Sequence, residues 1–135
     1  MTQADKELLL KDLSARLPYC VKVAYFNEDL THHSEPKSLI SIECINNLNY
    51  SRLEDEDGNT TIVEFVKPYL FPMSSMTGDE VLEYISLKES IIASDDITYY
   101  FETYESIDWL IKNHFDYRGL IPMGLALDAT GLNIY

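Results

Sequence analysis

The sequence predicts a single α+β domain, residues 1–135, with a largely antiparallel sheet and about three helices packed on it. Apolar residues recur at helical spacing near both ends of the chain, whereas short stretches between them alternate with a period of two. Helical and strand segments are mixed without a regular βαβ rhythm, which favours an antiparallel sheet. A chain of 135 residues can bury a sizeable core without disulfides or metals.

The chain begins with a helix and a strand. Thr2 or Asp5 can cap a helix that runs to about Arg16, where Pro18 ends it. Its buried side should carry four leucines, at positions 9, 10, 13 and 17, and Asp12 should face outward with the lysines. Residues 19–26 then alternate as a strand.

The middle of the chain reads as strands joined by polar turns. Residues 27–38 form a surface connection that contains His32 and His33, and residues 39–45 form a second strand. Residues 50–53 and 60–66 flank an acidic turn with Asp57-Gly58-Asn59, which is typical of a hairpin. The segment 67–72 contains two prolines, so we expect an extended crossing segment instead of a central strand.

Two further helices are predicted in the second half. Thr77 and Glu80 form a capping box for a helix over residues 78–89. After a short strand at 97–101, Thr103 caps a helix whose buried stripe has helical spacing: Ile107, Leu110, Ile111 and His114. Trp109 lies at the edge of that stripe and should pack on the segment from Phe115 to Ile121. A last hairpin strand is expected at 132–134.

Composition restricts the function classes. Ten basic and twenty-three acidic residues give a net charge of −13, so direct nucleic-acid binding is not expected. The N-terminus does not resemble a secretory signal and the apolar runs are too short to span a membrane, which predicts a soluble, cytoplasmic protein. The acidic surface either serves solubility or imitates the DNA backbone toward a basic site on another protein.

Motifs for metals, cofactors and disulfides are missing or incomplete. Cys20 and Cys44 are isolated, so we expect two small buried hydrophobes. Asp55, Asp57 and Asn59 match the start of a calcium loop, but Thr60 and Val66 stand where that loop requires glycine and glutamate. No glycine-rich phosphate loop or activated serine motif is present. The sequence therefore predicts no metal and no cofactor.

The densest polar cluster follows the last helix. His114, Asp116 and Arg118, with Tyr117, place a titratable base, a carboxylate and a guanidinium within five residues. Such a group can bind an anion or move a proton, as in a small hydrolase. The structural alternative is that Arg118 pairs with Asp116 or another acid while His114 caps carbonyls at the helix end.

Ten tyrosines are unusual for a chain of this length. Tyrosine and tryptophan act as rigid anchors at protein interfaces, although they also pack at the edges of cores with their polar ends in water. We predict a binding surface around the last helix that contains Trp109, Tyr117, Arg118 and Tyr104.

Three blocks of sequence are distinctive: DLSARLPY at 12–19, KPYL and PMSSMT at 67–77, and NHFDYRGLI at 113–121. Together they resemble a family of small uncharacterised proteins from gut Bacteroidetes and their phages. Cys20 stands where that family suggests glycine and Gly78 where it suggests an acid, which argues against catalytic roles there. The resemblance implies an intracellular product of a phage or prophage-rich genome and supplies no activity.

The leading hypothesis is a non-enzymatic accessory factor that binds another protein. The alternatives are a small hydrolase or anion-binding enzyme that uses His114, Asp116 and Arg118, and an acidic DNA mimic that inhibits a host protein. Neither the partner nor the oligomeric state follows from the sequence.

Overall fold

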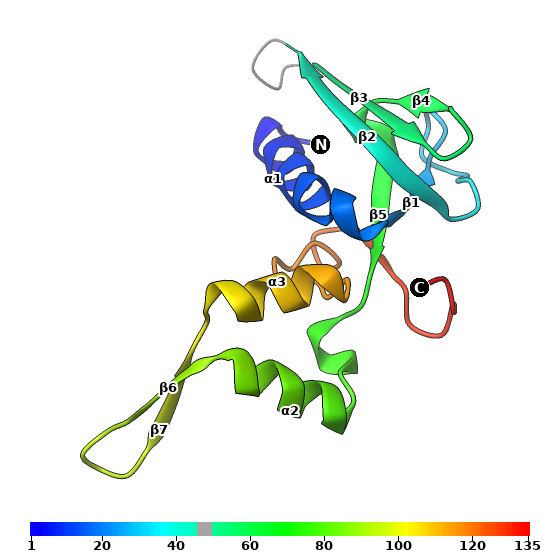
Figure 1. The fold of residues 1–135 in the computed structure, drawn as a ribbon. Helices are drawn as coiled ribbons and strands as arrows, with labels where there is room; N and C mark the ends of the chain where they lie inside the picture. The colour runs from blue at the N-terminus through cyan, green and yellow to red at the C-terminus, as the bar shows by residue number, and fades with distance from the viewer. Residues whose placement is uncertain (46–49) are drawn as a thin grey trace.

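The first helix, α1 (Gln3–Arg16), packs its leucines against a six-stranded sheet in the computed structural model, which describes residues 1–45 and 50–135 (Figure 1). Thr2 caps the helix as predicted, because its hydroxyl accepts the Asp5 amide at 3.1 Å and the Asp5 carboxylate accepts the Thr2 amide at 3.2 Å. A short 3₁₀ turn, η1 (Leu17–Tyr19), follows directly, so the first strand begins later than residue 19.

The sheet has the order β4-β3-β2-β1-β5-β8. Its members are β1 (Lys22–Tyr25), β2 (Lys37–Ile45), β3 (Tyr50–Asp55), β4 (Thr60–Thr61), β5 (Val66–Leu70) and β8 (Leu127–Asp128). All neighbouring pairs are antiparallel except β5 and β8, which are parallel. The predicted fold class, an α+β domain with a largely antiparallel sheet, is therefore confirmed.

The prediction that residues 67–72 cross outside the sheet is wrong, because β5 lies between β1 and β8. Pro68 stands opposite Val23. Three residue pairs further along the same two strands, the Phe26 amide donates to the Phe65 carbonyl at 2.7 Å. Hydrogen-bonded and non-bonded pairs alternate along an antiparallel ladder, so Pro68 occupies a non-bonded position toward β1. On the other side β8 begins only opposite Tyr69. The proline therefore costs the sheet no hydrogen bond at this register.

Two details of the first half of the chain differ from what the sequence pattern predicts. A register shift between Leu39 and Ser41 turns Ile40 to solvent and leaves Leu39 buried, as expected where a bulge interrupts a ladder. Cys20 and Cys44 are both exposed, so the prediction that they are buried hydrophobes is wrong. Cys20 ends the η1 turn with φ of 56°, a left-handed conformation that favours glycine.

The predicted acidic hairpin is present between β3 and β4. The Asp55 carboxylate, which is buried, accepts the amides of Asp57 and Asn59 at 2.9 and 3.0 Å. Gly58 takes a φ of 82° at the tip. The acidic side chains that resembled a calcium loop thus include one that shapes the turn by holding backbone amides. A 3₁₀ turn, η2 (Val63–Phe65), then leads into β5.

The remaining helices form a second, smaller core at one end of the sheet. A 3₁₀ turn, η3 (Met73–Ser75), precedes α2 (Gly78–Leu87), and α3 (Tyr104–Lys112) lies beside α2 in Figure 1. Both predicted caps are present, Thr77 on α2 and Thr103 on α3. The buried members of this core are Tyr84, Leu110 and Phe115. Of the three helices, α1 thus covers the sheet while α2 and α3 pack mainly on each other.

A two-stranded hairpin joins α2 to α3. It consists of β6 (Glu89–Ile92) and β7 (Thr98–Phe101), which pair antiparallel with each other and, among the described residues, with no strand of the six-stranded sheet. Figure 1 shows this hairpin extending away from the rest of the molecule. We call it the arm. The strand predicted at 97–101 is present, whereas β6 was not predicted. The expected strand at 132–134 does not form, since the tail has no regular structure beyond β8.

Candidate functional site

The polar segment after α3 is fastened to the end of β5. α3 ends at Lys112, and His114 takes a φ of 61° that turns the chain back. Phe71 then binds this segment through two backbone hydrogen bonds of 2.8 Å, donating to the His114 carbonyl and accepting from the Asp116 amide. The segment from Phe115 to Leu120 is therefore held on the body of the molecule, with both of those end residues buried.

A buried charge cluster joins this segment to α1. Asp12 and Arg16 are fully buried, which contradicts the prediction that Asp12 faces solvent. Arg16 Nε bonds to Asp12 Oδ2 at 2.9 Å, and Arg118 Nε bonds to Asp12 Oδ1 at 3.2 Å. Arg16 also donates to the Phe115 carbonyl at 2.6 Å. Two guanidinium groups thus share one carboxylate, and the cluster locks α1 to the segment that follows α3.

Asp116 has a structural role. Its two carboxylate oxygens accept the amides of Leu120 and Ile121, each at 2.8 Å. Both acceptors are therefore engaged in shaping the turn that contains Gly119, whose φ of 74° suits glycine. Arg118 pairs with Asp12 instead of Asp116. Each member of the predicted group of His114, Asp116 and Arg118 consequently faces different partners.

His114 is the member that lines a concave site. Its ring stacks on Tyr135 with centroids 3.7 Å apart, and its Nδ1 is buried without a hydrogen-bond partner in the described part of the chain. Burial, with a contribution from the positive charge of Arg16, lowers the pKa of His114 to about 4. The imidazole is therefore neutral at neutral pH and offers one donor and one acceptor.

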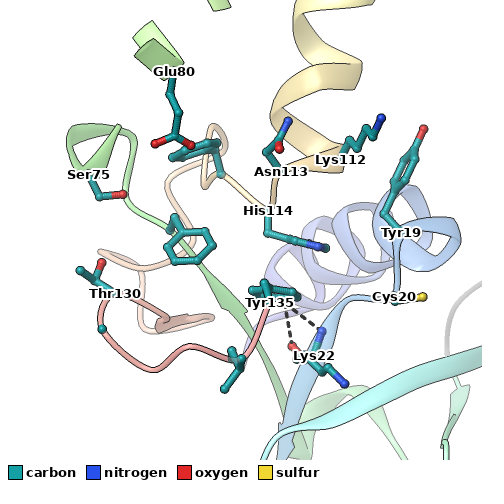
Figure 2. A pocket seen from close by; sticks show the side chains of 14 residues that line it. Tyr19, Cys20, Lys22, Ser75, Glu80, Lys112, Asn113, His114, Thr130 and Tyr135 are labelled. Carbon is teal, nitrogen blue, oxygen red and sulfur yellow. Dashed lines mark hydrogen bonds between the residues drawn. The ribbon is translucent and has the colours of Figure 1, made fainter. Parts of the chain in front are cut away.

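The hollow in front of His114 has a volume of about 620 Å³. Four chain segments supply its walls: the η1 turn with the start of β1, the end of β5 with η3 and the first turn of α2, the end of α3 with the residues after it, and the C-terminal tail. Figure 2 shows the stacked rings of His114 and Tyr135, with Lys112 and Tyr19 to one side of them and Ser75, Glu80 and Thr130 to the other. Tyr19 and Lys112 are exposed, so the hollow opens to solvent.

Tyr135 positions the tail along this wall. Its hydroxyl accepts the Lys22 amide at 2.8 Å and donates to the Tyr69 carbonyl at 2.7 Å, which ties the tail to β1 and β5. Phe71 also contacts the ring, with centroids 5.8 Å apart and the planes tilted by 57°. Burial raises the pKa of the Tyr135 phenol well above its ordinary value, so the hydroxyl keeps its proton.

The predicted binding residues lie in different environments. Trp109 stacks between Tyr84 and Phe115, with centroid distances of 5.7 and 5.5 Å, which confirms the expectation that it packs on the segment beginning at Phe115. Tyr117 is half-buried, with the Arg118 guanidinium carbon 4.8 Å from its ring centroid. Tyr104, by contrast, is 91% exposed at the base of the arm. Trp109 and Tyr117 pack on the same small core, and the binding surface around α3 stays a prediction.

The largest concentration of exposed apolar side chains lies on the arm. One face carries Ile91, Tyr99 and Phe101, and the other carries Ile92 and Tyr100, because alternate residues of a strand point to opposite faces. All five are about half exposed or more, and Ile92 is 72% exposed. The arm therefore offers apolar groups to both sides.

The base of the arm is held by a network around Glu102. Its carboxylate accepts the hydroxyls of Tyr84 and Ser106 and pairs with Lys88 Nζ at 3.1 Å. Partial burial tends to raise the pKa of Glu102, but the bonds from Ser106, Tyr84 and Lys88 outweigh it, so the pKa is lowered and the group is ionised at neutral pH. Thr103 Oγ1 adds a bond of 2.6 Å to the Leu87 carbonyl.

A second hollow lies beside this network. It has a volume of about 440 Å³ and is lined by Glu89, Glu102, Thr103, Tyr104, Glu105 and Ile107. We call it the acidic notch. Glu102 is already paired with Lys88, but Glu89 and Glu105 beside an exposed phenol suit a lysine or arginine side chain, which a tyrosine ring can also attract through its π electrons.

Several of these residues were not identified from the sequence. Asp12 and Arg16 share the spacing of the α1 leucines, which was a usable signal, since positions 9, 12, 13 and 16 lie on one helical face. Glu102 and Tyr135 gave no such signal because their partners are remote in the chain. The described residues bring together no cluster of three His, Cys, Asp or Glu side chains that suits a metal ion.

Within residues 1–45 and 50–135, each helix is too short or too polar to cross a bilayer. Comparisons of the chain with protein-family models, with curated proteins and with solved structures found no match. The resemblance to a family of small phage-related proteins therefore stays a prediction.

Proposed function

We propose that the protein binds another protein through the arm, and that the partner presents an apolar groove bordered by lysines and arginines. The observation that carries this proposal is that the arm exposes apolar side chains on both faces while pairing with no strand of the main sheet. The function is that of a non-enzymatic binding factor.

The arm gains little from folding on its own. An isolated two-stranded hairpin is marginally stable in water, and its side chains bury little surface against the domain. Contiguous exposed apolar surface on a folded protein is typical of an interaction site. Large aromatic and aliphatic residues such as Tyr100 and Ile92 are the kind that anchor interfaces.

Charge supports a basic partner. Between residues 88 and 105 the chain carries one lysine and five acids. Asp95 and Asp96 lie at the tip of the arm, and the acidic notch lies at its base, so carboxylates flank the apolar section at both ends. A groove with basic borders would complement this distribution and be steered toward it at low ionic strength.

The test is capture with matched variants of the full chain. Immobilised protein is exposed to an extract of the cells that produce it, at low and at high salt after nuclease treatment. Ile92→Ser/Tyr100→Ser alters one face of the arm and Ile91→Ser/Tyr99→Ser the other. Met123→Ser/Leu132→Ser, which changes exposed apolar residues outside the arm, is the control.

We expect a protein that is retained by the unmodified chain and the control, lost with at least one arm variant, and released by salt. A photo-reactive residue at Tyr104 should form a covalent adduct with the same protein, because Tyr104 borders the notch. Equal retention by the control and both arm variants would refute the proposal. An arm-dependent homodimer in sedimentation experiments would also refute it, because the occupant would then be a second acidic copy.

A further inference from the structure

The hollow in front of His114 lies apart from the arm, and the arm's proposed function does not explain it. Its volume of about 620 Å³ falls within the range of small-molecule sites, about 300–1,000 Å³. Residues from four separate segments line it. Two of these lining residues, Cys20 and His114, have positive φ values of 56° and 61°. Such strained backbone in residues other than glycine is concentrated at functional sites.

The walls of the hollow favour a flat, aromatic ligand. The rings of Tyr19, Phe71, His114 and Tyr135 all line it. The His114 and Tyr135 rings are stacked within 15° of parallel, so together they form a flat wall. Rings of this kind pack well on planar apolar ligands through offset stacking. Because His114 is neutral, its ring adds no charge to that wall at neutral pH.

The charged groups at the hollow favour an anion. Lys112 stands at the rim, in the last turn of α3, and has no carboxylate partner in the described residues. Glu80, the acid among the lining residues, already accepts the Thr77 amide at 2.9 Å in the first turn of α2. Lys22 also lines the hollow, but its amine donates to the Ser38 hydroxyl at 2.7 Å. Lys112 is therefore the lining cation whose amine has no side-chain partner in the described residues.

The buried charge cluster lies behind His114. Arg16 and Arg118 share the single carboxylate of Asp12, and the charge on Arg16 acts on His114. The neighbouring carboxylate of Asp116 is engaged by the amides of Leu120 and Ile121. The two guanidinium groups and the two carboxylates balance in formal charge, so the preference for an anion depends on Lys112 at the rim.

We infer that the hollow binds a small aromatic carboxylate, whose ring packs on the His114 and Tyr135 wall and whose carboxylate faces Lys112. The Asn113 side-chain oxygen lies beside Lys112 and can accept from a polar substituent, since its amide nitrogen already donates to the Trp109 carbonyl at 2.8 Å. This inference does not depend on the arm.

Three probes of similar shape test the inference on the full chain. They are indole-3-acetate, the uncharged indole-3-acetamide and the cationic tryptamine, titrated while the amide signals of Asn113, His114 and Thr130 are followed by NMR. The acetate should bind on the order of threefold more tightly than the amide, as expected for one partly exposed charge pair. Tryptamine should bind most weakly.

Two variants with matched controls complete the experiment. Lys112→Met should remove the preference for the acetate over the amide, while Lys11→Met, an exposed lysine on α1, should keep it. Tyr19→Ala should weaken all three probes, while Tyr99→Ala on the arm should weaken none. The inference fails if no probe shifts the three signals, if acetate and amide bind equally, or if Lys112→Met keeps the preference.

Discussion

His114 combines three features that are each uncommon in folded proteins. It adopts a positive φ, it is buried, and its Nδ1 has no hydrogen-bond partner within the described chain. A buried polar atom without a partner usually costs about 1–3 kcal/mol. The surrounding structure therefore has to hold the ring in place, and the Tyr135 stack and the backbone bonds to Phe71 supply that support.

The lowered pKa of His114 makes stability depend on pH. The unfolded chain binds a proton at His114 near pH 6.5, whereas the folded chain does so only near pH 4. Between these values the unfolded state binds more protons, so the free energy of unfolding rises with pH. The contribution is fully present above about pH 6.5 and is lost as the pH falls toward 4. Its upper limit is about 3 kcal/mol.

The measurement compares urea unfolding of the unmodified chain with His114→Asn at several pH values. Asparagine tolerates the left-handed backbone, so the variant removes the imidazole without requiring a new turn. The difference in unfolding free energy between the two proteins should shrink as the pH falls from 6.5 to 4. His32→Asn, an exposed histidine, is the control. A difference that does not vary over this range contradicts the prediction.

The buried charge cluster predicts unequal costs for its two arginines. Arg16→Met leaves Asp12 with one cation and leaves the Phe115 carbonyl with the Tyr117 amide alone as donor, so we expect a loss of about 3–5 kcal/mol in unfolding free energy. Arg118→Met removes one partly exposed partner and should cost less, about 1–2 kcal/mol. Urea denaturation measures both. Equal losses of unfolding free energy in the two variants would show that the bond from Arg16 to the Phe115 carbonyl contributes little.

At the scale of single residues, the sequence identified a structurally important cluster but did not identify the partners of its side chains. The cluster from His114 to Arg118 is structurally central, yet its partners lie on α1, β5 and the tail. Arg118 pairs with an aspartate 106 positions earlier. Periodicity describes only neighbours along the chain, so it cannot identify such a partner.

Among the elements, the arm is the one whose sequence pattern was least informative. β7 was predicted from alternating aromatic residues, whereas β6 is four residues long and directly follows the last turn of α2. Nothing in Glu89–Ile92 separates a strand from a continued helix. β5 was also misjudged, because the effect of Pro68 depends on its register against β1.

The exposed faces of the arm predict that its apolar residues contribute little to folding. Ile92→Ser should change the unfolding free energy by about 0.5 kcal/mol or less, as is usual for surface positions. Leu110→Ala, in the core between α2 and α3, should cost about 2–5 kcal/mol. Both are measured by urea unfolding. A large loss in Ile92→Ser would mean that the arm packs on the domain and is not free for a partner.

The two helix caps provide a further comparison between elements. Thr77 Oγ1 accepts one amide, that of Glu80, at 3.2 Å. Thr103 Oγ1 accepts the Ser106 amide at 3.1 Å and also donates to the Leu87 carbonyl at the end of α2. Thr77→Ala should cost about 1 kcal/mol, and Thr103→Ala about 2 kcal/mol because a second bond is lost. Equal costs in thermal unfolding would show that the bond to Leu87 is not stabilising.

On the scale of the whole molecule, the fold class followed from local periodicity but the strand order did not. The leucine spacing of α1 and the alternation of β1 and β2 belong to short windows. The order β4-β3-β2-β1-β5-β8 depends on contacts between residues far apart, including the parallel β5 and β8 pair. The tail reaches the edge of the sheet only because the segment after α3 first crosses the end of β5.

The net charge of −13 predicts opposite effects of salt on folding and on binding. Twenty-three acids face only ten basic residues, so most carboxylates repel one another in the compact state. At 0.1 M, sodium chloride largely screens the repulsion between exposed charges that lie more than about 10 Å apart. The urea midpoint of unfolding should therefore rise between 10 and 300 mM salt. Capture of a basic partner by the arm should weaken over the same range, because screening removes the attraction. If the urea midpoint fell with salt, the few ion pairs would outweigh the general repulsion, and the excess acid would have to be balanced within the fold.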